Sequence, residues 1–160
     1  MTMIRQGAAA ELWGAAIREA CGHGAGRLDE ALESYLVFVL LRHQRDQHLL
    51  ARTQALAWLE AQARAGEART DALRDVGDRC LLIAGLFPEL AERRRVRIEY
   101  FIDLGRGAYR DIADAGRNAY AALFAQLAQA YHALVQVLRD VREPRLPAAA
   151  AGWPARAGLH

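Results

Sequence analysis

The chain has 160 residues, of which 25% are charged and 53% are apolar, and its formal net charge is +2. This size and composition are typical of one globular domain with its own core. So small a net charge gives no reason to expect nucleic acid or a membrane as a partner. No apolar run approaches the ~20 residues of a membrane span, no signal-peptide pattern opens the chain, and there are only two cysteines, so we expect a cytoplasmic protein.

Apolar residues recur at helical spacing along most of the chain, and no strand pattern appears. Glycines and prolines divide the pattern into helices over about 9–21, from 28 onward, 49–65, 70–87, a short turn over 88–93, 97–115 and 118–143. Thr70 is the expected N-cap of one of them. The run 36–41 is apolar on every side and predicts that its helix is central. We therefore predict an all-α, single-domain bundle of five to six helices over 1–143, followed by a Pro/Ala-rich tail over 144–160.

The clearest pattern is a heptad seam in the last predicted helix. Its apolar residues alternate at spacings of four and three: Tyr120, Phe124, Leu127, Tyr131, Leu134, Leu138 and Val141. Such a seam predicts one long amphipathic helix that needs a helical partner. Because the preceding helix is too short to cover all of it, we expect a homodimer, with an interaction surface formed by Tyr131, Leu134, Leu138, Val141 and Trp153.

Gly105 lies in the middle of an apolar helix face, where glycine costs about 1 kcal/mol relative to alanine. One explanation is a close approach between helices at this point. The other is a flat site for a planar ligand, such as a tetrapyrrole, and that site would use Tyr100, Asp103, Gly105 and Tyr109. The first explanation is the more common one.

Asp78 follows Gly77 in a largely apolar helix, and we predict that it forms a buried pair with an arginine. The carboxylates Glu99 and Asp103 lie one helical turn apart and are expected on a solvated face with arginines nearby.

The chain contains arginine but no lysine, and its one basic cluster is Arg93-Arg94-Arg95 with Arg97. This usage reflects either a coding bias or a surface that binds phosphate or carboxylate groups.

Catalytic signatures are missing from the sequence: there is no Gly-x-Ser-x-Gly, no P-loop and no dinucleotide-binding motif. Cys21 and His23 could supply two zinc ligands, but no second pair is evident. We therefore predict no catalytic residues, no metal and no cofactor.

Three segments carry a resemblance. Arg74 to Asp78, Ala84 to Pro88 and Tyr100 to Tyr109 contain a Gly-Asp, a Gly-x-Phe-Pro and a Tyr-x-x-x-x-Gly-x-x-x-Tyr in this order. The order resembles that of an uncharacterised family of small, all-helical bacterial proteins, and the stretch that begins at Tyr35 fits as well. The resemblance implies a helical fold and a bacterial source, but no activity.

Two functional hypotheses follow from the sequence. The first is a non-catalytic interaction or regulatory module that acts through a helical surface and has a protein partner. The second is a small-ligand-binding protein or enzyme with a pocket beside Gly105. A solid core with an exposed apolar patch would favour the first. A pocket with a buried carboxylate would favour the second.

Overall fold

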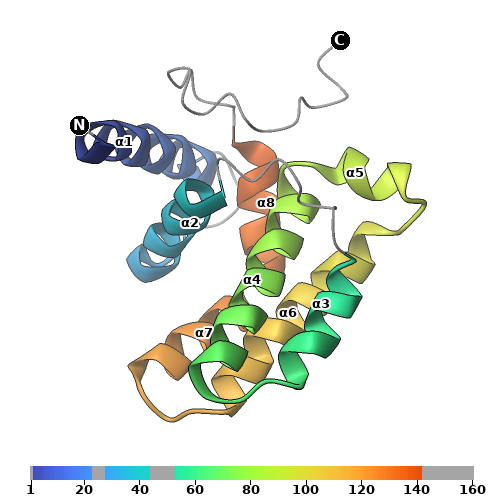
Figure 1. Cartoon of the computed structure of the whole chain (residues 1–160). Helices are drawn as coiled ribbons and strands as arrows, with labels where there is room; N and C mark the ends of the chain where they lie inside the picture. The colour runs from blue at the N-terminus through green and yellow to red at the C-terminus, as the bar shows by residue number, and fades with distance from the viewer. Residues whose placement is uncertain (1, 23–27, 44–52, 142–160) are drawn as a thin grey trace.

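The computed structural model describes residues 2–22, 28–43 and 53–141, and these residues form eight helices and no strand (Figure 1). The all-α prediction is confirmed. The helices are α1 (Thr2–Ala20), α2 (Glu30–His43), α3 (Gln54–Gln62), α4 (Gly66–Gly85), α5 (Pro88–Arg93), α6 (Ile98–Asp114), α7 (Ala119–Gln129) and α8 (Tyr131–Asp140). There are more helices than the predicted five to six because the turn at Pro88 forms α5 and the heptad segment divides into α7 and α8.

The central helix is α4, not the α2 that its apolar run predicted. Helix α4 packs against α3, α5, α6 and α8, whereas α2 packs mainly against α1 and leaves Phe38 45% exposed (Figure 1). Most side chains of α4 from Leu73 to Gly85 are buried. Its glycines allow this crowding, since a Cβ at Gly77 would overlap the Tyr109 ring and a Cβ at Gly85 would overlap Leu138.

Local signals set several helix ends. Proline at the first position of α5 fits the helix without losing a hydrogen bond, and Asn118 caps α7 by accepting a hydrogen bond from the Ala121 amide at 2.9 Å. The N-cap prediction at Thr70 is wrong. Helix α4 already begins at Gly66, and the Thr70 hydroxyl donates to the Gly66 carbonyl within the helix at 3.3 Å.

The predicted long heptad helix is broken at Ala130, where α7 and α8 meet at an angle of 67°. Helix α7 lies on α6, whereas α8 lies on α4 and also touches α1. The bend allows the two halves of one apolar seam to pack on different neighbours. Tyr131, Leu134, Leu138 and Val141 are at most 2% exposed within the single chain.

From Phe124 to Val141 the seam is therefore covered within the chain, and only Tyr120 at its start is exposed. This burial corrects the interaction surface expected in the second half of the seam. Trp153 and the boundary between residues 143 and 144 lie outside the described residues, which end at Val141. The residues proposed for the homodimer interface are thus buried within one chain or lie outside the described residues. The homodimer itself stays a prediction.

Candidate functional site

A buried polar cluster surrounds Asp78 of α4, in the middle of an otherwise apolar core. Its Oδ1 accepts hydrogen bonds from the hydroxyls of Tyr35 at 2.7 Å and Tyr109 at 2.6 Å. Its Oδ2 lies 3.6 Å from Nε2 of His43. Asp78 is fully buried, so the carboxylate depends on these partners in place of water. The predicted burial is correct, but the partners are two tyrosines and a histidine rather than an arginine.

A third tyrosine completes the cluster. Tyr131 donates to the Gly77 carbonyl at 2.8 Å, and its ring contacts that of Tyr109 edge-on at a centroid distance of 5.5 Å. Burial is the main cause that raises the pKa values of Tyr35, Tyr109 and Tyr131, and the negative charge of Asp78 acts in the same direction. The three hydroxyls therefore stay protonated and serve as hydrogen-bond donors.

This arrangement explains Gly105. A Cβ at this position would overlap the Tyr131 hydroxyl and would lie 2.8 Å from Cβ of Cys80. The space beside Gly105 is thus occupied by the chain's own side chains, and a planar ligand has no room on this face. The close-approach explanation is the one that the geometry supports.

Replacing Gly105 by alanine is expected to lower the free energy of unfolding by about 1–3 kcal/mol, because the added methyl overpacks the core. Gly107 of the same helix is the matched control, since a Cβ there meets nothing within 4 Å. Gly107→Ala should raise stability by about 0.5–1 kcal/mol through helix propensity. Urea unfolding of both variants measures the difference, and equal effects would contradict the packing explanation.

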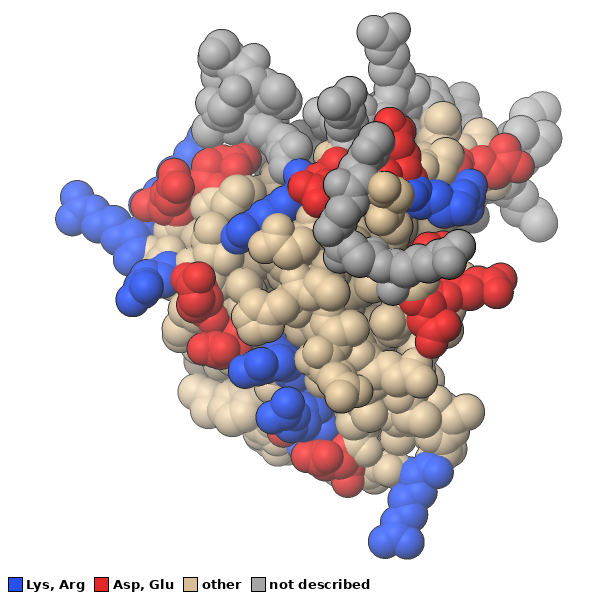
Figure 2. Space-filling model, turned by 180° about the vertical axis from the view of Figure 1, so that it is seen from behind, with Lys and Arg blue, Asp and Glu red and all other residues tan. Residues whose placement is uncertain are grey.

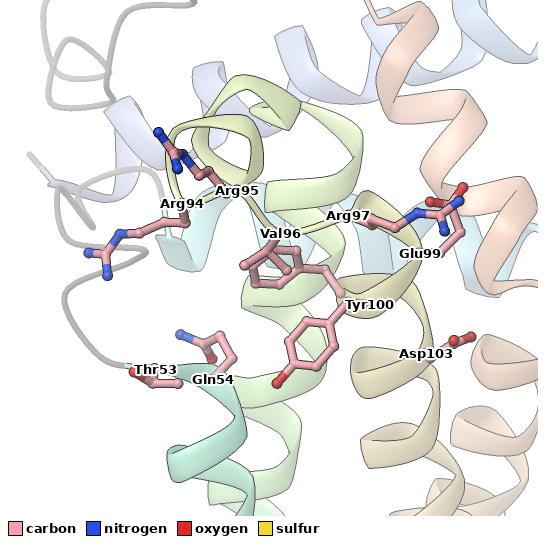
Figure 3. Close-up of a pocket in the computed structure, with 10 residues that line it drawn as sticks. Thr53, Gln54, Arg94, Arg95, Val96, Arg97, Glu99, Tyr100 and Asp103 are labelled. Carbon is pink, nitrogen blue, oxygen red and sulfur yellow. The ribbon is translucent and has the colours of Figure 1, made fainter.

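A separate hollow of about 880 Å³ lies at the surface, between the first turn of α3 and the first turn of α6 (Figure 3). Phe101 and Gln54 are almost fully buried in its wall, whereas Tyr100 is 45% exposed. The complete lining is Thr53, Gln54, Arg94, Arg95, Val96, Arg97, Glu99, Tyr100, Phe101 and Asp103.

Two structural features hold the walls of this hollow. Helix α3 is fixed to α6 because Trp58 and Gln62 both donate to Oδ2 of Asp111, at 3.1 and 2.7 Å. The connection between α5 and α6 is short, so it carries Arg94, Arg95 and Arg97 directly to the rim. Figure 3 shows the Tyr100 ring directed from α6 toward Gln54 of α3, and Asp103 directed away from it.

The structure divides the predicted ligand site into two places. Tyr100 and Asp103 line the hollow, whereas Gly105 and Tyr109 belong to the buried core. Asp103 is a solvated carboxylate with Arg106 at 3.5 Å, as expected for that face, and the buried carboxylate is Asp78. Sequence reasoning missed the role of His43 and Gln54. Each is a polar residue that is almost fully buried, and Asp78, which lies near His43, is 35 residues away in the chain.

Charge is mixed on the surface opposite to the view of Figure 1. On that face, basic and acidic residues alternate around a largely uncharged centre (Figure 2).

No single described helix is long and apolar enough to cross a membrane. Helices α7 and α8 taken together are long and apolar enough, but they form a bent pair.

Comparisons with protein-family models, with curated proteins and with solved structures found no match for this chain. The resemblance to a bacterial helical family therefore stays a prediction.

Proposed function

We propose that this protein is a non-catalytic interaction module that binds an acidic segment of a partner protein in the hollow between α3 and α6. The observation that carries the proposal is the half-exposed Tyr100 beside a rim of three arginines, Arg94, Arg95 and Arg97. An acidic partner is chosen because the cations are concentrated on the connection that borders Tyr100.

The composition of the hollow matches that of protein interfaces. Tyrosine and arginine are the residues most enriched at positions that dominate binding energy. The half-buried Val96 lines the same hollow as Tyr100 and provides apolar surface on which an apolar side chain of the partner can pack. The arginines then pair with carboxylates that flank this side chain, and Arg is well suited to such pairs because its guanidinium binds carboxylates bidentately.

The size of the hollow favours a second candidate, a small anionic ligand. Its volume of about 880 Å³ lies within the ~300–1,000 Å³ of small-molecule sites. Native mass spectrometry of the purified protein separates the candidates, since a small ligand retained by the chain adds a defined mass. The buried cluster around Asp78 is assigned no binding role, because the rings of Tyr109 and Tyr131 fill the space beside its glycines.

The interaction proposal is tested by selecting binders from a random peptide display library on the immobilised chain. Replacing Tyr100 by alanine should weaken the selected peptides about 30-fold, the effect of a residue that contributes ~2 kcal/mol to binding. Tyr120→Ala is the matched control, because Tyr120 is 40% exposed but lies on α7 and accepts a hydrogen bond from Arg74 at 3.3 Å.

Calorimetric titration of the selected peptides measures both variants. Equal affinity for the wild type and for Tyr100→Ala would contradict the proposed surface. Binding should also weaken with added salt, since exposed charge pairs are screened.

A homodimer, if one forms, needs a surface other than the heptad seam. The exposed apolar residues of α3, Leu56 at 52% and Leu59 at 58%, are the best candidates. A dimer through these residues would be compatible with the proposed function, since α3 also forms one wall of the hollow.

A further inference from the structure

Helix α5 ends in a hydrogen-bonding pattern that normally calls for glycine. The Arg95 amide donates to the Glu92 carbonyl at 2.9 Å, and the Val96 amide donates to the Ala91 carbonyl at 3.0 Å. These two bonds form a Schellman motif, in which the residue after the C-cap adopts a left-handed conformation. Here that residue is Arg95, with φ of 56°.

A side chain at this position is unfavourable. Left-handed φ brings Cβ close to the backbone, so glycine is the usual residue and arginine carries a conformational cost. Among the described residues, the only other positive φ belongs to a glycine, Gly66. Residues held in such conformations are found preferentially at ligand-binding sites, where the side chain is needed.

The position of Arg95 at the hollow indicates a function for its side chain that explains this conformational cost. Arg95 is exposed and lines the hollow, and the two backbone bonds fix the direction in which its side chain leaves the connection. The charge of Arg95 is therefore exposed at the rim of the hollow.

We infer that Arg95 is the anion-recognising residue of the hollow, and that it binds a carboxylate of the acidic partner segment next to the apolar side chain held by Tyr100. The inference rests on the proposed function, and it adds a specific residue and a specific chemical group. The ordinary alternative is that Arg95 serves only the C-terminal end of α5, where a cation is favourable. The two explanations differ in what happens to stability when the side chain is removed.

Arg95→Gly tests both the conformational cost of arginine at this position and its proposed role in binding. The variant should be more stable, with Tm raised by about 2–4 °C, the shift that relief of ~1 kcal/mol produces in a domain of this size. Arg94→Gly is the matched control, since it removes the same charge from the adjacent residue, whose φ of −89° gives glycine no advantage. Its Tm should not rise. A lower Tm for Arg95→Gly would show that the arginine supports the helix end and would overturn the inference.

Binding is followed with the same random peptide display library. Peptides selected on the wild type should be enriched in Asp and Glu. Selection on Arg95→Gly should lose this enrichment at least tenfold, whereas Arg95→Lys should retain most of it. If the enrichment persists on Arg95→Gly but peptide binding is lost on Tyr100→Ala, the proposed function stands and the role of Arg95 is refuted. If neither variant changes the selection, both proposals fail.

Small anions form a separate arm of the experiment. Citrate and pyrophosphate are titrated into the wild type and into Arg95→Gly and are followed by calorimetry. We expect neither to bind the wild type at micromolar concentration. Binding that depends on Arg95, without any selected peptide, would refute the acidic protein segment as the occupant and would assign the hollow to a small ligand.

Discussion

Replacing Asp78 by alanine is expected to lower the free energy of unfolding by about 3–5 kcal/mol. The carboxylate is fully buried and accepts hydrogen bonds from Tyr35 and Tyr109, each of the charge-assisted kind. Removing the carboxylate removes the free-energy cost of burying its charge, which is stabilising. It also leaves both tyrosine hydroxyls without this acceptor and creates a cavity, which is destabilising. The destabilising effects should be the larger because two donors lose the same partner. Urea unfolding monitored by circular dichroism measures the loss.

Asp75→Ala provides the matched control. Asp75 lies on the same helix and also links α4 to α2, through a 2.7 Å ion pair with Arg42, but both side chains are about 30% exposed. Removing it should cost no more than about 1 kcal/mol. Asp78→Asn should fall between the two, because its amide oxygen can still accept from the tyrosines. A loss for Asp78→Ala as small as that for Asp75→Ala would contradict the described network.

Alkaline pH is expected to unfold the protein steeply. Burial raises the pKa values of Tyr35, Tyr109 and Tyr131 in the folded chain, whereas in the unfolded chain these hydroxyls ionise near pH ~10. Above that pH the unfolded state binds fewer protons than the folded state, so stability falls as the pH rises. Each group contributes ~1.4 kcal/mol per pH unit, and three together about 4 kcal/mol per unit. The buried Cys80 thiol, whose pKa is also raised, acts in the same direction.

The measurement is the free energy of unfolding as a function of pH, together with the ultraviolet absorbance of tyrosinate. The full stability should be present below about pH 8, should begin to decline as the unfolded Cys80 thiol ionises near pH ~8.5, and should decline steeply above pH ~10, where the unfolded tyrosines ionise. The absorbance of these three tyrosines should appear only as the chain unfolds. Tyr131→Phe should reduce the slope above pH ~10 by about one quarter, since Tyr35, Tyr109 and Cys80 still contribute. Three tyrosines that ionise while the helical circular dichroism is intact would show that the cluster is open to solvent.

The two predictions together describe the cluster as a structural centre rather than a reactive one. Tyr35 comes from α2, Asp78 from α4, Tyr109 from α6 and Tyr131 from α8, so one carboxylate and its neighbours join four helices. A defect there should destabilise the whole domain, whereas the hollow beside Tyr100 tolerates changes on its exposed rim. Stability and binding are therefore separable by mutation, and the proposed experiments depend on this separation.

The sequence by itself determined the features that depend on neighbours along the chain. Helical periodicity gave the fold class, Pro88 the start of α5, and Asn118 the start of the heptad segment. The apolar surroundings of Asp78 were sufficient to predict its burial. Gly105 indicated a close approach, although not the residue that makes it. These inferences succeeded because the energies that decide them act within one or two helical turns.

Only the tertiary structure decided the break at Ala130, the partners of Asp78 and the existence of the hollow. A regular heptad pattern is satisfied by one straight helix or by two that bend onto different neighbours, and the choice depends on where α4 and α6 lie. The partners of Asp78 are 31 to 43 residues away in the chain, and the hollow joins residues 53–54 to residues 94–103. Such contacts depend on how whole helices pack, and spacing along the sequence carries no information about that packing.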